Sequence, residues 1–316
     1  MTSPAATMHG KTVLLTGATG GMGEVVATEL ARRGATVVLA VRDQAKGEAL
    51  QRQIVATTGN PAVDLLVADL ADFAAVRRLA AEFRARYAAL HVLVNNAGTI
   101  VREQRRNADG VELNLAINYL APFLLTNLLV DTFKASAPAR IVNVGSNAMT
   151  KTLDLDDLQS ERRFRPMAVY GRAKLALLMS GYALARRLAG TGVIVNALHP
   201  GVTRTNIIDE ASPPIARPFL GLIKRVVQTP EQGARTTIYL ATAPEIASIT
   251  GKYFIKGREQ TSPPVSYDTD LQERLWRISD HLVGLTSEPA ATSTAVAPPT
   301  GSPPGLAGRA AASNPL

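Results

Sequence analysis

Short runs rich in Val and Leu alternate with longer amphipathic stretches over the first 200 residues, and this order constrains the fold more than any other feature. Because the runs hardly alternate between apolar and polar residues, they are typical of parallel strands that are buried on both faces. Strands are expected at Thr12–Thr16, Thr36–Val41, Val63–Ala68, His91–Asn95, Arg140–Val144 and Val193–Leu198. A further strand is expected at Lys252–Ile255.

Helical patterns lie between and after these runs. The clearest are Met22–Arg33, which Gly34 closes, Met167–Leu188, which is followed by Gly190 and Gly192, Pro230–Ala241 and Leu271–Leu282. A connection from one strand through a helix to a parallel neighbour is right-handed. The order therefore predicts an α/β protein with a single Rossmann-type, doubly wound parallel sheet of about seven strands, in the order 3-2-1-4-5-6-7, flanked by helices.

Composition separates one folded domain from two terminal segments. With 46% apolar residues the chain has enough material for a sizeable core, and we expect one domain over residues 11–286 after a flexible N-terminus of residues 1–10. Residues 287–316 are mostly Ala, Pro, Ser, Thr and Gly, and we expect a disordered tail because they bury too little apolar surface to offset their ordering entropy. The absence of cysteine excludes disulfides, thiolate metal ligands and a cysteine nucleophile. No metal site is expected.

The net charge of +8 raises the question of an acidic partner. The arginines are scattered, and no aromatic residues or DNA-binding motif accompany them, so nucleic-acid binding is not expected. No segment approaches eighteen consecutive apolar residues and the N-terminus lacks the pattern of a signal peptide. We therefore expect a cytoplasmic protein without a transmembrane segment.

A glycine-rich turn directly follows the first expected strand. Residues 16–23 read Thr-Gly-Ala-Thr-Gly-Gly-Met-Gly, and a helix opens within them. Glycines allow a tight turn and a close approach of the backbone to a pyrophosphate, whose charge meets free N–H groups and the positive end of the helix dipole. The turn therefore predicts a dinucleotide site. Its expected contacts are Gly17, Thr19, Gly21, Met22 and Gly23.

The end of the second strand bears on the choice of dinucleotide. An NAD enzyme is expected to have an acid there that binds the ribose diol, but Val41 takes this place and Arg42 follows it. An arginine can pair with a 2′-phosphate and stack on adenine, so NADP(H) is the preferred cofactor. NAD(H) is left open, because a shift of one residue would let Asp43 reach the ribose.

The spacing of Gly17, Gly21 and Gly23 resembles the TGxxxGxG turn of the short-chain dehydrogenases/reductases. Two further phrases match that family in order: Asp69-Leu70 after the third strand, and Asn95-Asn96-Ala97-Gly98 after the fourth. The resemblance implies that Asp69, with Leu70, contacts the adenine ring. It implies that Asn96, Ala97 and Gly98 support the sheet and the adenosine half.

A Tyr-x-x-x-Lys pair carries the expected chemistry. Tyr170 and Lys174 lie one helical turn apart on the same face, and Ser146 follows the fifth strand. An unperturbed tyrosine has a pKa of about 10, too high for efficient proton exchange at neutral pH, and an adjacent ammonium favours the phenolate. Alone the spacing is a common accident, but the order of the surrounding motifs favours a catalytic group.

The resemblance assigns roles to this group. Tyr170 is implied to be the general acid/base, Ser146 to orient the substrate oxygen, Lys174 to lower the tyrosine pKa and bind the nicotinamide ribose, and Asn118 to hold a relay water. The phrase after the sixth strand resembles the family loop that packs on the nicotinamide, which adds Pro200, Gly201, Thr203 and Thr205 as cofactor contacts.

Several phrases are similar to the retinol dehydrogenase branch, among them residues 41–48, 156–161, 184–188 and 229–234. That branch implies an NADP(H)-linked oxidoreductase that interconverts a small lipophilic alcohol with an aldehyde or ketone. The sequence departs from the family in two respects: Gly145 replaces a usual serine, and we expect no membrane anchor. Substrate contacts are expected at Met149, Phe164, Met167, Ile207 and Phe219.

Two rival functions and one assembly question stay open. A tetrapyrrole reductase would share many of these phrases but uses a cysteine, which the chain lacks. A non-catalytic NADP-binding sensor or scaffold would not need Ser146, Tyr170 and Lys174. Many family members pair through the helices that begin near Asp109 and Met167, so the resemblance implies a homodimer or homotetramer unless insertions or the tail prevent pairing.

Overall fold

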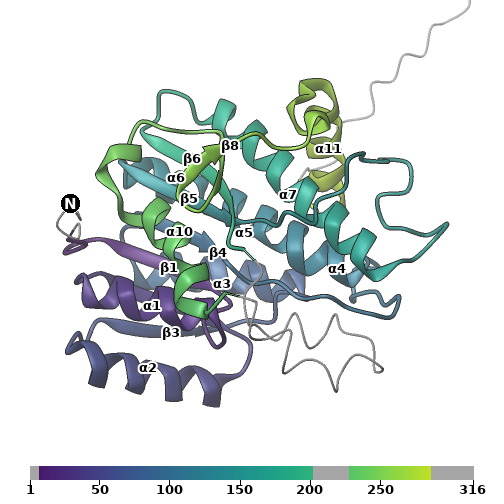
Figure 1. The fold of residues 1–316 in the computed structure, drawn as a ribbon. Coiled ribbons are helices and arrows are strands. Elements are labelled where there is room, and N and C mark those ends of the chain that lie inside the picture. Colours follow the sequence, from purple (N-terminus) through teal and green to yellow (C-terminus); the bar gives the residue numbers. More distant parts are fainter. Residues whose placement is uncertain (1–6, 202–227, 286–316) are drawn as a thin grey trace, which may run out of the picture. The chain divides into compact units, whose positions relative to one another are not determined.

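The computed structural model describes residues 7–201 and 228–285, and these contain an eight-stranded sheet in the order β3-β2-β1-β4-β5-β6-β7-β8 (Figure 1). The strands are β1 Thr12–Thr16, β2 Thr36–Val41, β3 Val63–Val67, β4 Val92–Asn95, β5 Ala139–Val144, β6 Val193–His199, β7 Lys252–Ile255 and β8 Arg258–Gln260. All neighbouring pairs are parallel except β7–β8. The predicted order of the first seven strands is confirmed.

The eighth strand was not predicted. It pairs with β7 through a tight turn in which Lys256 and Gly257 both have a positive φ. Its three residues, Arg258, Glu259 and Gln260, are all exposed. An exposed edge strand without an apolar residue leaves no periodicity to read.

The helices are α1 Met22–Arg32, α2 Gln44–Thr58, α3 Phe73–Arg86, α4 Leu113–Leu115, the π-helix η1 Ala116–Leu120, α5 Ala121–Leu128, α6 Val130–Ala135, α7 Pro166–Arg187, α10 Pro230–Thr242, the 3-10 turns η3 Pro244–Ile246 and η4 Pro264–Tyr267, and α11 Thr269–Leu282. The four helices that the sequence predicted, α1, α7, α10 and α11, are present with bounds within two residues of those expected, and the structure adds further helices between the strands. Thr229 caps α10 in a reciprocal pair with Gln232, which fixes the start of that helix.

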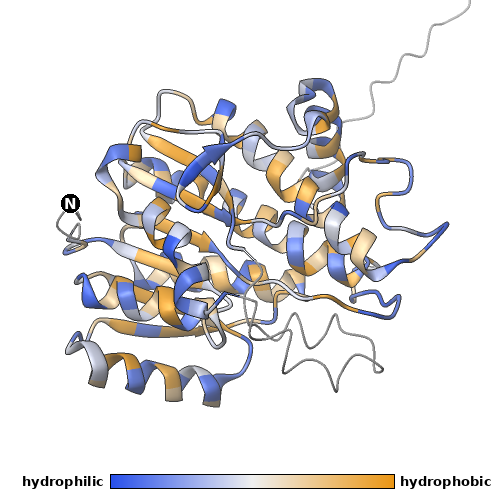
Figure 2. Cartoon of the chain, viewed as in Figure 1, coloured by the Kyte–Doolittle hydropathy of each residue, from blue (hydrophilic) through white to orange (hydrophobic). Residues whose placement is uncertain are grey.

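The core has two main parts, one on each face of the sheet, and a smaller cluster of Leu178, Tyr182, Ala197 and Tyr253. In β1, Leu14 packs with α3, α5 and α7, whereas Val13 and Leu15 pack with α1 and α10. Side chains of successive strand residues point to opposite faces, so a strand that is covered on both sides needs an unbroken apolar run. Figure 2 shows these strands as predominantly hydrophobic.

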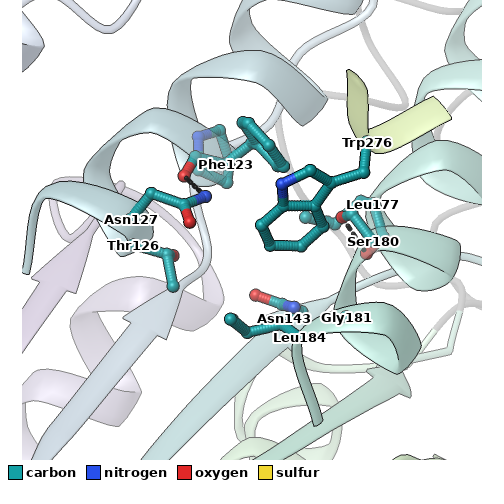
Figure 3. A pocket seen from close by; sticks show the side chains of 10 residues that line it. Phe123, Thr126, Asn127, Asn143, Leu177, Ser180, Gly181, Leu184 and Trp276 are labelled. Carbon is teal, nitrogen blue, oxygen red and sulfur yellow. Dashed lines mark hydrogen bonds between the residues drawn. The ribbon is translucent and has the colours of Figure 1, made fainter. Parts of the chain in front are cut away.

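Helix α11 is held against α5 and α7 by an aromatic side chain. Trp276 meets Phe123 edge to face, with ring centroids 4.8 Å apart, and the Arg187 guanidinium lies 4.0 Å from the indole ring centroid. The crevice around Trp276 retains only about 10 Å³ (Figure 3). Tyr119 and Ser279 add a buried hydroxyl contact of 2.5 Å. The helices that begin near Asp109 and Met167 were expected to form the contact between subunits. Helix α11 of the same chain thus covers part of them.

None of the helices within the described ranges is both long enough and apolar enough to cross a membrane.

Candidate active site

The carboxyl ends of β1 and β4 are tied together by one asparagine and one threonine. The Asn96 side-chain amide donates to the carbonyl oxygens of Thr16 and Gly17, at 3.1 and 2.9 Å. In return the Thr16 hydroxyl accepts from the backbone N–H groups of Asn96 and Ala97, each at 3.1 Å. The loop after β4 therefore supports the glycine turn from behind.

The glycine turn forms a cradle that no other residue type could form. A Cβ on Gly17, which has a φ of 66°, would lie 2.7 Å from the Ala97 Cα, and a Cβ on Gly23 would lie 2.1 Å from the Gly17 carbonyl oxygen. Gly21 has a φ of 53° and precedes α1 without any side-chain cap. The Gly23 N–H donates to the Gly20 carbonyl at 3.1 Å. The other N–H groups of the first turn of α1 are available for an anion, and Thr19 is exposed nearby. This geometry fits a dinucleotide pyrophosphate.

The ends of β2 and β3 place Arg42 near Asp69. The backbone N–H of Ala68 donates to the Val41 carbonyl at 2.8 Å, so the residues that follow both strands leave the sheet side by side. Arg42 is exposed and makes no hydrogen bond or ion pair with the described part of the chain. Asp69 is exposed and Leu70 is half-buried.

Asp43 has a structural task instead. Its side chain caps α2 by accepting from the backbone N–H of Lys46 at 3.1 Å. An N-cap aspartate is engaged with the helix terminus. Of the two charged residues after β2, Arg42 is therefore the one left for a ligand.

The structure brings Ser146, Tyr170 and Lys174 together at the carboxyl end of β5. All three side chains are buried, and the Ser146 side chain is near enough to the Tyr170 phenol to lower its pKa. The Lys174 ammonium lies 5.8 Å from the centroid of the Tyr170 ring and donates to the Val144 carbonyl at 2.9 Å. The i, i+4 spacing on α7 thus produces one compact group with the serine.

Burial governs the ionisation of this group. It lowers the pKa of Lys174 to about 8, because the charged ammonium is the form that loses solvation. Burial also raises the pKa of Tyr170, and the Ser146 side chain opposes that rise. Where two such neighbouring groups interact strongly, their pKa values belong to the pair and not to either residue.

Asn118 lies in the π-helix η1, fully buried next to Lys174. Its Oδ1 accepts from the Thr99 N–H at 3.1 Å, and its Nδ2 donates to the carbonyl oxygens of Thr99 and Asn114, each at 2.9 Å. Both N–H donors are thus used, so a water on this residue would bind the remaining lone pair of Oδ1 or the main-chain carbonyl. A Cβ on Gly98 would lie 3.0 Å from Asn118 Oδ1 and 3.3 Å from Lys174 Nζ, so the glycine permits their approach.

Several positioning residues were missed by sequence reasoning. A Cβ on Gly171 would lie 2.2 Å from the Ala148 carbonyl oxygen, so this helical glycine lets the serine loop touch α7. His199 Nδ1 accepts from the Asn147 N–H at 3.2 Å. A glycine inside a long helical pattern usually has a packing reason, and that was the one available signal.

Gly145 also acquires a physical explanation. Its N–H donates to the Leu198 carbonyl at 2.7 Å, and a Cβ there would lie 3.0 Å from that same oxygen. The Tyr253 hydroxyl donates to the Ser146 carbonyl at 3.2 Å. The glycine therefore draws the serine segment close to β6, and the departure from the family pattern leaves Ser146 in place.

The remaining predicted contacts divide into two sets. Met149 packs partly buried against the core, Phe164 is half-buried, and Met167 is 49% exposed on the first turn of α7, one turn before Tyr170. Pro200 is half-buried, and Gly201 has a φ of 92° at the end of β6. Four predicted residues lie outside the described residues: Thr203, Thr205, Ile207 and Phe219.

Comparison with known proteins agrees with this architecture. The family model for short chain dehydrogenase matches residues 11–215. The chain is 40% identical to human retinol dehydrogenase 13 over 289 residues, which cover 89% of this chain and 86% of that protein. It is also 40% identical to human retinol dehydrogenase 14 over 294 residues, 88% of each chain.

Solved structures show the same fold. An uncharacterized protein from Mycobacterium paratuberculosis superposes with a TM-score of 0.71 at 32% identity, over 89% of this chain and 96% of that one. A protein described as an NAD(P)-dependent gluconate 5-dehydrogenase from Beutenbergia cavernae, with NADP bound at low occupancy, gives a TM-score of 0.63 at 28% identity, over 79% and 96%.

The chain belongs to the short-chain dehydrogenase/reductase family and is similar to its retinol dehydrogenases. It is an NAD(P)-dependent oxidoreductase that acts on CH–OH groups.

Proposed function

We propose that this oxidoreductase uses NADP(H) to interconvert a lipophilic alcohol with the corresponding aldehyde or ketone. The observation that carries the proposal is the buried group of Ser146, Tyr170 and Lys174, with the lysine ammonium 5.8 Å from the tyrosine ring. The group stands on the same sheet edge as the glycine cradle, where a dinucleotide would lie.

Each member of the group has a distinct task. A bound nicotinamide would give or accept the hydride. Tyr170 gives its phenol proton to the substrate oxygen in reduction and takes it back in oxidation. Ser146 hydrogen-bonds the same oxygen where negative charge develops. Lys174 favours the phenolate, and the two N–H groups not bonded to Val144 are free for the nicotinamide ribose.

Asn118 is proposed to hold a relay water beside Lys174. Its side chain anchors the loop after β4, so a water at its remaining acceptor would lie beside the Lys174 ammonium. A proton could then reach Tyr170 through Lys174 without opening the buried group.

The NADP preference rests on Arg42. An exposed guanidinium without a partner in the described chain can form charge-assisted hydrogen bonds with a 2′-phosphate. Because Asp43 caps α2, it is not free to bind both ribose hydroxyls as an NAD enzyme requires.

The lipophilic substrate is proposed from the apolar residues near Tyr170 and from the relatives. Met167 lies on the first turn of α7 and Met149 follows Ala148, which approaches Gly171 of the same helix. Thioether side chains adapt to apolar ligands of irregular shape. The human relatives are retinol dehydrogenases. From them we propose an elongated apolar alcohol as the substrate class of this enzyme.

The test is an NADPH oxidation assay with a panel of aliphatic aldehydes, ketones and retinal. Wild type should consume NADPH with at least one carbonyl compound, and Tyr170→Phe should lower kcat/KM by about 10²- to 10⁴-fold while NADPH affinity changes little. Binding of NADPH without reduction of any carbonyl would favour the sensor function. Full activity of Tyr170→Phe would refute the assignment of the proton carrier.

A further inference from the structure

Three basic residues line one cavity at the amino edge of the sheet, opposite the edge that carries Tyr170. Lys11 precedes β1, His91 precedes β4 and Arg140 lies near the start of β5, and these three strands are neighbours. The His91 N–H donates to the Thr12 carbonyl at 2.9 Å and the Arg140 N–H donates to the His91 carbonyl at 2.8 Å. The register thus brings together residues that are far apart in sequence.

Arg140 is the central member of this group. Its side chain is half-buried and donates to the Leu240 carbonyl at 3.1 Å, which occupies one of its five N–H donors. No carboxylate of the described residues forms an ion pair with it, and Glu245, which is exposed on η3, acts on it only from beyond ion-pair distance. Partial burial of a charge without an ion-pair partner is costly, and an anion in the cavity would offset that cost.

His91 presents a donor to the same space. Its Nδ1 accepts from the Thr12 backbone N–H at 3.0 Å, so the neutral ring carries its proton on Nε2. Burial, and then the charge of Lys11, lower the pKa of His91, which keeps the ring neutral at pH 7. The imidazole therefore supplies an N–H donor without adding a third positive charge.

The rest of the described cavity lining is mostly apolar, with Thr7 and Thr242 as its polar side chains. The cavity volume is about 250 Å³, and Pro138, Ile194 and Pro244 are among its walls. No Asp or Glu is among the described residues that line it. The volume falls just below the roughly 300–1,000 Å³ of pockets for drug-sized ligands, so the space suits a compact molecule.

We propose that the cavity between Lys11, His91 and Arg140 binds a small oxyanion, a carboxylate or phosphate carried on a short apolar body. Arg140 pairs with the anionic oxygens, His91 donates to them from the side, and Lys11 supplies the second positive charge. The apolar walls receive the body of the ligand. This site is separate from the proposed cofactor and substrate sites, and it does not depend on the proposed function.

The experiment follows the His91 imidazole by NMR in the full chain labelled with ¹⁵N-histidine, during separate titrations with inorganic phosphate and with butyrate. The loss of one signal in His91→Gln identifies the resonance among those of the four histidines. A saturable shift of the His91 signal is expected with at least one probe. A response to butyrate alone identifies a carboxylate site, and a response to phosphate alone identifies a phosphate site.

Variants distinguish this site from general charge attraction. Arg140→Gln should weaken the binding about tenfold or more, because hydrogen bonds to charged groups are worth about 1.5–3 kcal/mol. Arg258→Gln, an exposed position on β8, removes the same charge elsewhere and should leave the affinity unchanged. If Arg140→Gln fails to fold, Lys11→Gln provides the same comparison. The absence of a His91 shift with both probes, or equal weakening in the cavity variant and in Arg258→Gln, would overturn the proposal.

Discussion

The two edges of one sheet carry sites that are built in different ways. At the carboxyl edge the shape of the site depends largely on the backbone. Gly17, Gly23 and Gly98 each lie so close to another group that a Cβ would clash with it. At the amino edge, side chains at or just before the starts of β1, β4 and β5 converge on an open cavity, and its basic groups are the side chains of Lys11, His91 and Arg140. A site made from backbone leaves a local motif in the sequence, whereas a site made across strands leaves none until the strand order is known.

Apart from the loss of the Tyr170 phenol, the largest expected effect at the carboxyl edge comes from Gly171→Ala. The new Cβ would meet the Ala148 carbonyl at 2.2 Å and push the serine loop away from α7. A displacement of about 1 Å can cost roughly 10²-fold in rate, so kcat/KM should fall by about that factor. Steady-state kinetics checks this, with circular dichroism to verify folding.

Gly181→Ala is the matched control in the same helix. Its Cβ would meet the Asn143 side-chain amide at 3.2 Å and not a backbone atom, so most of the activity should remain. Equal losses in both variants would mean that the helix, and not the contact with the serine loop, is sensitive.

The next effect concerns the pH dependence of alcohol oxidation. Oxidation needs the deprotonated form of the Tyr170–Lys174 pair, so kcat/KM rises with pH through the apparent pKa of the pair. Burial lowers the Lys174 pKa to about 8, and a positive nicotinamide ring further favours loss of the proton, which places the rise at or below that pH.

Lys174→Met removes the ammonium and leaves the buried phenol with its raised pKa. The rise should then move above pH 10, which would be measured as a lateral shift of the pH–rate profile. A profile that falls in amplitude without moving would assign Lys174 to ribose binding alone.

Arg42→Ala tests the choice of cofactor at the carboxyl edge. Loss of charge-assisted hydrogen bonds should weaken NADPH by about tenfold or more, whereas NADH, which has no 2′-phosphate, should be affected much less. Fluorescence titration with both nucleotides measures the difference. Equal weakening of the two would disprove the role of Arg42 in choosing NADP(H).

The smallest effect is expected for Tyr253→Phe. The variant removes a hydrogen bond of 3.2 Å to the Ser146 carbonyl and retains the ring. A hydrogen bond of this kind contributes about 0.5–1.5 kcal/mol, so kcat should fall two- to tenfold, by the same free-energy scale. A fall in kcat with an unchanged KM indicates a positioning role, whereas a lower melting temperature with full activity indicates a purely structural one.

The predicted parts of the fold are those in which one local property dominates. The strands β1, β2 and β7 begin and end where the apolar runs do, because burial on both faces determines their composition. The π-helix around Asn118 could not be foreseen, since a shift in hydrogen-bond partners leaves no mark on residue type. The polar strand β8 was missed for a similar reason.

The candidate site shows the same division. Tyr170 and Lys174 were visible because both lie on one helix at a fixed spacing. The support from His199 to the serine loop joins residues 52 positions apart, and only the pairing of β5 with β6 brings them together. The position of Arg140 beside His91 likewise depends on tertiary register.

Helix α7 carries the catalytic residues, and residues adjacent to them contact the segment between Ser146 and α7. Tyr170 and Lys174 form the catalytic group with Ser146. Between them in the sequence, Gly171 leaves room for the Ala148 carbonyl and Arg172 donates to the Ser160 hydroxyl at 2.6 Å. The segment between Ser146 and α7 is therefore clamped to the helix that carries the proton donor. If that segment were replaced by the one from a relative, a new substrate would keep its orientation only if Gly171 and Arg172 were retained. An exchange of the segment without Gly171 and Arg172 would lower kcat more than it altered the choice of substrate.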